Sequence, residues 1–439
     1  MVVRNGKVLT PRGFELLDLR VAEGRIVEIS GNLDDDANVL DAGGMWVLPG
    51  VVDSHVHFNE PGREHWEGFA TGAAALAAGG GTSFIDMPLN AAPPTIDRES
   101  FEAKKRAGEV SSVLDFALWG GLIPGNANRL PELAECGVVG FKAFLIDSGT
   151  ADFPGVDRAT LREGMKIAAD LRLPVAVHAE DPEIIAAKTQ EIRAAGGRDA
   201  RAWFDSRPIE SEVRAVEMAI ETARDTCCAL HVVHLSAPVA VDLVVDARRE
   251  GLDITCEACP HHLLMSEQAM LEHGAMAKCA PPLRADAVRA ELWNLLLRGK
   301  IDCVGSDHSP APPEMKMGDD LFEMWGGIMG AQHGFVALLD AVLDAAPDRL
   351  PEIWEKLSRV PAARFGIGDR KGRLEPGCDA DFILVRREEP REIAADELLY
   401  RHKTSPYVGR SLRTRVVKTF RRGEEVGLQR NGGRFLSRG

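Results

Sequence analysis

No run of 18 uncharged apolar residues occurs among the 439 residues, so the sequence contains no candidate for a membrane-spanning helix. The first ten residues include Arg4 and Lys7 and have no apolar core of signal-peptide length. Acidic residues outnumber basic ones by 67 to 52, which gives a formal charge of −15 without a basic stripe. These absences argue against a membrane protein and against a nucleic-acid-binding protein.

The sequence also lacks the paired cysteine pattern of a small secreted protein. Its 8 cysteines are scattered, which is typical of a reducing cytosol where thiols stay free. Cys256 and Cys259 form a C-x-x-C motif ahead of His261 and His262, but no second pair follows at a suitable spacing. We therefore expect a cytoplasmic protein without a zinc site at this motif.

Short apolar runs alternate with longer stretches of helical apolar spacing from residue 51 to about residue 307. The eight runs that we predict as strands are Val51–His57, Thr82–Met87, Leu114–Trp119, Val138–Leu145, Pro174–His178, Ala229–His234, Asp253–Cys256 and Ile301–Asp307. Stretches of helical spacing between them include Trp66–Ala78, Arg158–Asp170, Glu210–Arg224, Val239–Arg249 and Ala285–Leu297. Mostly apolar strands joined by helices indicate a parallel sheet that is covered on both faces. Eight such units in one run predict an α/β fold, a (β/α)8 TIM-type barrel spanning residues 48–371.

The two ends of the chain have a different pattern, in which alternating runs are separated by turn signals. These runs are Lys7–Thr10, Asp18–Val21, Arg25–Ile29, Ala380–Val385 and Arg415–Phe420. Neither end could bury a core alone. We therefore expect residues 1–47 and 372–439 to meet in one small β-sandwich domain beside the barrel.

Residues of the types that bind metals occur at the predicted carboxyl ends of these strands. His55 and His57 form an H-x-H pair, and two residues at this spacing point to the same face of a strand. His178 and His234 end two further strands, and Asp307 ends the eighth. A single histidine is more often a core or surface residue, but the carboxyl ends of barrel strands form the face on which active sites are built. The convergence predicts a metal centre, and the ligand types suit zinc, manganese, cobalt, nickel or iron.

Lys142 lies in the run V-V-G-F-K-A-F-L-I, which should be buried on both faces. A buried ammonium group without a partner is costly, so this amine must be neutral, paired or modified. Three interpretations remain open for the lysine by itself. It could be the Schiff-base lysine of a barrel aldolase, a member of a structural salt bridge, or an amine that has added carbon dioxide and bridges two metals as a carbamate. The histidines on neighbouring strands favour the carbamate.

Several motifs make the chain similar to the cyclic amidohydrolases, the group that includes dihydroorotase, hydantoinase, dihydropyrimidinase and allantoinase. They are D-S-H-V-H-F-N-E-P-G-R-E-H-W-E-G at 53–68, G-F-K-A-F at 140–144, C-V-G-S-D-H-S-P at 303–310 and C-D-A-D-F-I at 378–383. The resemblance covers nearly the whole chain. It implies two divalent metal ions, zinc first among the candidates. His55, His57 and Asp307 would hold one ion, His178 and His234 the other, and a CO2-derived carbamate on Lys142 would bridge both.

Within this group, the details resemble the allantoinases. Dihydroorotases usually carry an arginine two residues after the H-x-H motif to clamp the substrate carboxylate, whereas this chain has Asn59. Hydantoinases and dihydropyrimidinases usually lack the E-P-G-R-x-x-W-E-G stretch that is present at 60–68. P-P-E-M-K at 312–316, W-G-G-I at 325–328 and Y-R-H-K-T-S-P-Y-V-G-R at 400–410 look like allantoinase segments. The chain departs from the pattern at 147–157, a possible rim loop, and at Ala280, where serine is common.

The reaction that the resemblance implies is hydrolysis of the ring amide of the cyclic ureide allantoin to allantoate, a step of purine catabolism, by a hydroxide bound to the two metals. Asp307 would be the catalytic residue that passes the proton of this hydroxide to the leaving ring nitrogen. Asn90, Cys279 and Ala280 are the expected substrate contacts. The alternatives are a hydantoinase or dihydropyrimidinase with the same metals and a different rim, and a non-catalytic scaffold protein. The resemblance also implies a homo-oligomer, either a tetramer or a dimer.

Overall fold

Two parallel sheets lie at the centre of the computed structural model, which describes residues 1–34, 38–427 and 432–438. One sheet has the order β6–β7–β8, and the other has the order β14–β13–β12–β11–β10–β9. Their bounds are β6 (Val51–Val56), β7 (Gly81–Asp86), β8 (Asp115–Leu118), β9 (Gly120–Gly121), β10 (Phe141–Phe144), β11 (Val175–His178), β12 (Leu230–Val232), β13 (Ile254–Ala258) and β14 (Cys303–Val304). All eight predicted strands are present, and β9 is an addition. The predicted α/β fold with parallel strands is confirmed.

The edges of the two parallel sheets approach each other at both ends. Only Trp119 separates β8 from β9, and its backbone N–H donates to Asp86 of β7 at 3.0 Å. At the opposite edges, His308 beyond β14 forms a parallel bridge with Val56 of β6. The backbone N–H of His57 also donates to the carbonyl oxygen of His308 at 2.8 Å.

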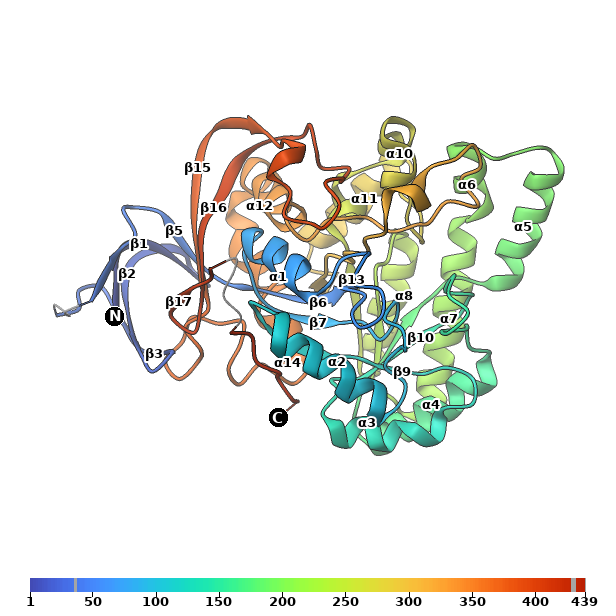
Figure 1. Ribbon diagram of the computed structural model, residues 1–439, viewed down its shortest axis with the longest axis horizontal. Helices are drawn as coiled ribbons and strands as arrows, with labels where there is room; N and C mark the ends of the chain where they lie inside the picture. The colour runs from blue at the N-terminus through green and yellow to red at the C-terminus, as the bar shows by residue number, and fades with distance from the viewer. Residues whose placement is uncertain (35–37, 428–431, 439) are drawn as a thin grey trace.

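Helices connect the parallel strands and cover them, as Figure 1 shows. Their bounds are α1 (Phe69–Ala78), α2 (Arg98–Ser111), α3 (Leu130–Cys136), α4 (Arg158–Asp170), α5 (Pro182–Ala194), α6 (Ala200–Ser206), α7 (Ile209–Thr226), α8 (Pro238–Arg249), α9 (Pro260–Leu264), α10 (Glu267–His273), α11 (Asp286–Leu297), α12 (Gly334–Ala345), α13 (Leu350–Glu355) and α14 (Arg359–Arg364). Several start at an aspartate whose carboxylate accepts otherwise unpaired N–H groups, as Asp157 does from Thr160 at 2.8 Å. No described helix combines the length and the apolar character needed to cross a membrane.

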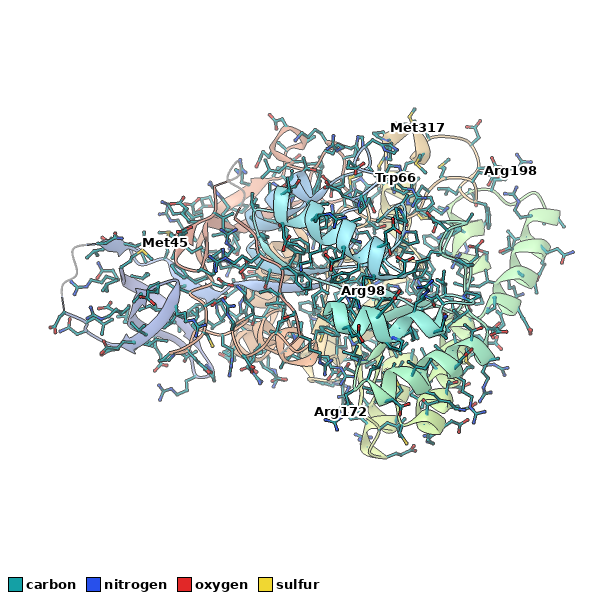
Figure 2. The ribbon with its side chains drawn as sticks, turned by 60° about the horizontal axis from the view of Figure 1, so that its bottom comes forward. Met45, Trp66, Arg98, Arg172, Arg198 and Met317 are labelled. Atoms are coloured by element: carbon teal, nitrogen blue, oxygen red, sulfur yellow. The ribbon has the colours of Figure 1, made fainter. Side chains whose placement is uncertain are left out.

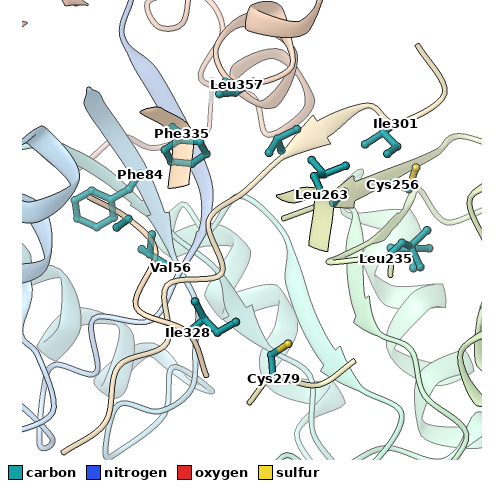
Figure 3. Packing of buried hydrophobic residues seen from close by; sticks show 14 of the residues in the cluster. Val56, Phe84, Leu235, Cys256, Leu263, Cys279, Ile301, Ile328, Phe335 and Leu357 are labelled. Atoms are coloured by element: carbon teal, nitrogen blue, oxygen red, sulfur yellow. The ribbon is translucent and has the colours of Figure 1, made fainter. Parts of the chain in front are cut away.

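Apolar side chains from the strands and the helices fill the interior (Figure 3). Val56 of β6 and Phe84 of β7 are buried together with Leu263 of α9 and Phe335 of α12. Burial of this apolar surface is the main favourable contribution to folding. The strands are buried on both faces for the same reason, and their polar residues are left for the ends of the strands.

The two ends of the chain meet in a mixed sheet with the order β17–β16–β15–β5–β1–β2–β3, and β4 pairs with β1. Its strands are β1 (Val2–Thr10), β2 (Gly13–Ala22), β3 (Arg25–Ser30), β4 (Val39–Asp41), β5 (Trp46–Pro49), β15 (Phe382–Glu392), β16 (Ser411–Arg421) and β17 (Glu424–Glu425). In Figure 1 these strands lie beside the parallel sheets at one end of the molecule. The described strands from the two ends of the chain pair as one eight-stranded sheet. Its apolar side chains, including Val3, Leu19 and Phe382, form a separate core.

Candidate active site

His55 and His57, at the end of β6, face Asp307 beyond the end of β14. The Nε2 atoms of His55 and His57 lie 3.2 Å and 3.4 Å from Oδ1 of Asp307. The Nδ1 atom of each histidine, on the opposite side of the ring, donates a hydrogen bond. Nδ1 of His55 donates to Glu257 Oε1 at 2.7 Å, and that of His57 donates to the Leu89 carbonyl oxygen at 3.1 Å. Both histidines therefore present Nε2 to one point, where a metal ion could bind.

His178 ends β11, and His234 follows β12. Their ring centroids lie 4.7 Å apart, and the His234 centroid is 5.4 Å from that of His55. Nε2 of His178 donates to Glu180 at 2.8 Å, which leaves Nδ1 for another partner. Nδ1 of His234 is buried and has no hydrogen-bond partner among the described residues. The structure thus brings all four sequence-predicted histidines to one place.

Lys142 of β10 is fully buried, and its Nζ atom has no hydrogen-bond partner in the described part of the chain. Burial lowers the pKa of this amine to about 8, although Asp307 and Glu257 act in the opposite direction. A neutral amine is nucleophilic towards carbon dioxide, and the carbamate that results is an anion able to bind cations. The orphaned amine among metal-type ligands therefore fits a carbamylated lysine.

The protonation states of the cluster suit metal binding. Burial lowers the pKa of His55, His178 and His234, so the imidazoles are neutral, which is the form that binds metals. Burial alone would raise the pKa of Asp307, but His55 and His57 outweigh it and hold this pKa far below its usual range. The site therefore combines neutral nitrogen ligands with an ionised carboxylate.

The backbone is strained where two of these side chains project. His234 has a φ of 39° and Asp307 a φ of 44°, both in the left-handed region that side chains with a Cβ atom adopt at a cost. Such strain persists where the surrounding structure enforces it, and it concentrates at functional sites. Both residues follow strand ends, where the chain turns to aim its side chain at the cluster.

The cluster forms the floor of a cleft of about 580 Å³. The three predicted substrate contacts, Asn90, Cys279 and Ala280, all line this cleft. The other lining residues are Leu89, Phe144, Ile146, Asp147, Ser148, Gly149, Thr189, Trp203, Arg207, Lys278, Ser309, Phe322, Glu323, Met324, Trp325, Gly326 and Gly327. The 147–157 segment thus contributes to the rim, as its position in the sequence suggested. Asn59 is buried, and its amide donates to the Pro310 carbonyl oxygen at 3.2 Å.

Sequence reasoning missed the carboxylates that hold the histidines. Glu180 lies two residues after His178, and the alternation of a strand was a signal that both could reach one side. Glu180 also accepts from Arg207 at 2.5 Å, and the Arg207 guanidinium stacks over the Trp203 ring at 4.5 Å. Glu257 gave no comparable signal, because it immediately follows a predicted strand and its partner lies on β6.

Two other clusters contain residues of metal-binding type. Cys259, His261 and His262 offer ligand atoms within 4.8 Å of one another. Cys256 lies apart from this cluster, and its thiol contacts the Lys300 carbonyl oxygen at 3.8 Å, so the C-x-x-C pair does not converge on one point. In the second cluster, three aspartates surround the ammonium group of a lysine that supplies the charge a cation would bring; they are Asp115, Asp379 and Asp381 around Lys371.

The chain belongs to the amidohydrolase family, whose model matches residues 46–426. Membership implies a binuclear metal centre, for which the histidines and Asp307 described above are candidate ligands. Proteins similar to the chain include the allantoinase of Solibacter usitatus, with 47% identity over 97% of this chain and 93% of that protein. The allantoinase of Rubrobacter xylanophilus is 48% identical over 100% and 95%, and that of Escherichia coli (strain SE11) is 40% identical over 97% and 94%. The predicted resemblance to allantoinases is confirmed.

Solved structures of the same family have the same fold. The L-hydantoinase (dihydropyrimidinase) from Arthrobacter aurescens matches with a TM-score of 0.96 and 32% identity, covering 100% of this chain and 99% of that one. The dihydropyrimidinase from Brevibacillus agri matches with a TM-score of 0.90 and 26% identity over 100% and 98%. The likeness in fold is therefore complete along the chain, whereas the sequence similarity is higher to the allantoinases.

Proposed function

We propose that this protein hydrolyses the ring amide of allantoin to give allantoate. The observation that carries the proposal is the convergence of His55 and His57 on Asp307, at 3.2 Å and 3.4 Å, on the floor of the cleft. Lys142 is buried on neighbouring β10, and its Nζ atom has no hydrogen-bond partner among the described residues. The choice of allantoin among cyclic amides rests on allantoinases that are 40–48% identical over 97–100% of the chain.

In this proposal, His55, His57 and Asp307 would hold one divalent ion and His178 and His234 a second, and Lys142, as its carbamate, would supply a shared anionic ligand. The ligand types favour zinc and also allow manganese, cobalt, nickel or iron. When bound, such a pair of ions activates water as a nucleophile and polarises the carbonyl under attack.

The protein's own groups position the substrate and move the proton. Asp307 remains ionised and lies at the cleft floor, so its carboxylate accepts the proton of the attacking water and delivers it to the leaving ring nitrogen. Asn90, Cys279 and Ala280 line the wall and orient the ring. Glu257 and Glu180 hold His55 and His178 in the tautomers that the site requires.

We further propose that the two parallel sheets close into a (β/α)8 barrel over residues 48–371, with residues 1–47 and 372–439 as the small β-domain. The contacts of Trp119 with Asp86 and of His57 with His308 support closure at the two junctions between the sheets. The small-molecule substrate is a cyclic ureide. A homo-oligomer, as tetramer or dimer, and a cytoplasmic location stay predictions.

An assay of four cyclic amides as substrates tests the proposed substrate. The purified protein is loaded with zinc, manganese or cobalt in bicarbonate and offered allantoin, hydantoin, dihydrouracil and dihydroorotate. We expect preferential formation of allantoate. If another ring opens while allantoin is untouched, the substrate assignment is wrong and a hydantoinase or dihydropyrimidinase is favoured. Absence of turnover on every ring with every metal would favour the scaffold protein.

The Asp307→Asn variant tests the proton-transfer role in the same assay. The amide keeps an oxygen ligand but cannot accept the proton, so we expect retained metal and a loss of turnover of about 10²–10⁴-fold. Metal content is measured on the same samples by elemental analysis. Turnover close to that of the unmodified protein would remove Asp307 from this role.

A further inference from the structure

One wall of the cleft is built from a segment without helix or strand, residues 321–327, which we call the outer wall. Six consecutive residues of it, 322–327, line the cleft, and the Gly327 end lies beside Ser309, two residues after Asp307. Met317, a few residues earlier, is 71% exposed and lies at the periphery of the molecule (Figure 2). A segment without regular structure must satisfy its carbonyl groups by other means, because unpaired buried carbonyls are costly.

Two lysine side chains satisfy the carbonyls of the outer wall. Nζ of Lys278 donates to the carbonyl oxygens of Leu321, at 2.6 Å, and Met324. Nζ of Lys316 donates to the carbonyl oxygens of Gly327, at 2.7 Å, and Trp325, at 3.3 Å. Four carbonyl groups of a seven-residue segment thus converge on two ammonium groups.

The main chain beside each lysine also binds the outer wall. The N–H of Gly327 donates to the Lys278 carbonyl oxygen at 2.7 Å, and the N–H of Trp325 donates to the Met315 carbonyl oxygen at 2.7 Å. Each lysine therefore belongs to a segment that already lies against the outer wall, and its side chain adds a second anchor to the same segment.

Both lysines are buried at a cost that their packing alone does not explain. Lys278 is 3% exposed and Lys316 is 5% exposed, and every hydrogen bond described for their ammonium groups ends on a main-chain carbonyl. Burial lowers the pKa of both to about 7, with a further contribution from Arg207 at Lys278 and from Lys278 at Lys316. An apolar side chain of similar length would fill the same volume without this cost. The carbonyl groups of the outer wall are therefore the main hydrogen-bond partners of both ammonium groups, and that of Lys278 also lies 4.1 Å from the centroid of the Trp203 ring.

The outer wall faces the part of a substrate that points away from the cleft floor. If the floor takes the reacting ring amide, as the proposed function requires, the exocyclic ureido group of allantoin, with its N–H donors and carbonyl acceptor, would point towards the walls of the cleft, of which 322–327 is one. Trp325 in the wall has a buried indole N–H without a partner among the described residues, and its ring packs against Trp66 at 4.9 Å. Glu323 adds a carboxylate to the same wall.

We propose that Lys278 and Lys316 are specificity-determining positioning residues, which hold the outer wall in the conformation that accepts the exocyclic ureido group. The inference rests on the proposed function. It predicts that the two lysines act on recognition of the substituted ring and leave the chemistry at the floor unchanged.

The test uses Lys278→Met and Lys316→Met in the full-length, metal-loaded protein, with Lys188→Met as the control. Lys188 is exposed on α5 and pairs only with Glu191 at 2.9 Å among the interactions described. For each lysine variant we expect the KM for allantoin to rise about 10-fold or more, because the carbonyl groups of the outer wall lose their buried donor. In Lys316→Met, whose side chain does not line the cleft, kcat should change less than about threefold. The inhibition constant of hydantoin, a ring without the ureido group, should stay within about twofold of that of the unmodified protein.

A second measurement tests directly whether the two lysines stabilise the outer wall. Hydrogen exchange of the peptide spanning 317–328 should be faster in both variants and unchanged in Lys188→Met. Lys316→Gln, which keeps N–H donors without the charge, should recover most of the KM and serves if the methionine variant does not fold. Unchanged exchange, or equal weakening of allantoin and hydantoin, would overturn the proposal.

Failure of the proposed function can be distinguished from failure of the inference about the two lysines. If the unmodified protein did not open allantoin, the substrate assignment would fail while the exchange measurement still tested whether the lysines hold the wall. The KM comparison would then be made between substituted and unsubstituted forms of the ring that the protein does open, with the same expected outcome.

Discussion

Single residues behind the metal-type side chains decide which ring nitrogen each histidine presents. Glu257 accepts from His55 Nδ1 at 2.7 Å and from the Ser54 hydroxyl at 2.6 Å, and its other neighbour, His231, lies 3.7 Å away. Burial would raise the pKa of Glu257, but His55 and His231 outweigh it and hold this pKa far below its usual range. The carboxylate is therefore charged, and it keeps the proton of His55 on Nδ1.

Removal of this charge should weaken the metal site without removing a ligand. In Glu257→Gln the His55 tautomer is no longer enforced, so we expect metal affinity to fall about 10–100-fold. Calorimetric titration of the metal-free protein with zinc measures the change. The control is Glu291→Gln, whose side chain is 47% exposed on α11. Equal affinities in the two variants would show that Glu257 does not orient His55.

The positions of the site residues were predictable where a rule of the fold applied. His55, His57, His178, His234 and Asp307 follow from the rule that side chains at the carboxyl ends of parallel strands meet on one face. Lys278 and Lys316 follow no such rule, because their partners are carbonyl groups of a segment without regular structure. A lysine that binds carbonyls looks like any surface lysine in the sequence.

At the level of elements, strand ends were predicted less well than strand existence. The run Ile301–Asp307 was predicted as one strand, but β14 spans only Cys303–Val304. The chain leaves the ladder at Gly305, where an added Cβ atom would lie 2.6 Å from Glu257 Oε2. The close approach of a side chain from β13 is a tertiary constraint that hydrophobic periodicity does not contain.

A buried ionic cluster joins β8 to the segment that leads into β15. Nζ of Lys371 lies 2.6 Å from Asp115, and 2.8 Å from each of Asp379 and Asp381. Burial would lower the pKa of Lys371, but the three carboxylates raise it well above its usual value. All four side chains are buried, so the parallel sheets and the small mixed sheet are connected by charges that water does not screen.

Loss of this lysine should be costly, because it removes the one ion-pair partner described for buried Asp381 and leaves Asp115 and Asp379 with their arginine partners alone. We expect Lys371→Met to lower the free energy of unfolding by about 3–5 kcal/mol. Lys418→Met, which removes an exposed pair with Glu425, should cost about 0–1 kcal/mol. Urea unfolding of both variants measures the difference. Similar losses in the two variants would mean that the cluster contributes no more than a surface pair.

At the level of the whole molecule, the half-buried His333 makes stability depend on pH. Burial lowers the pKa of His333 to about 4. Between about pH 4 and 6.5 the unfolded chain therefore binds a proton that the folded chain does not. The free energy of unfolding rises with pH across this window, and the contribution of His333 is lost as the pH falls through it.

Replacement of His333 should flatten this dependence. We expect the slope of unfolding free energy against pH near pH 5 to be smaller by about 1.4 kcal/mol per pH unit in His333→Gln, which corresponds to one proton. Urea unfolding at several pH values gives the slope. The exposed histidine variant His65→Gln should keep the slope of the unmodified protein. An unchanged slope in His333→Gln would mean that His333 is protonated equally in both states.

The arrangement of the mixed sheet has a consequence for synthesis on the ribosome. Strand β5 lies between β1, its parallel neighbour, and β15, its antiparallel neighbour, although more than 300 residues separate β5 from β15 along the chain. A growing chain therefore carries one edge of β5 without its partner until nearly the whole polypeptide has emerged. Unpaired strand edges invite pairing with other chains. Until β15 arrives, this edge of β5 is therefore a site at which the nascent protein can pair with other chains.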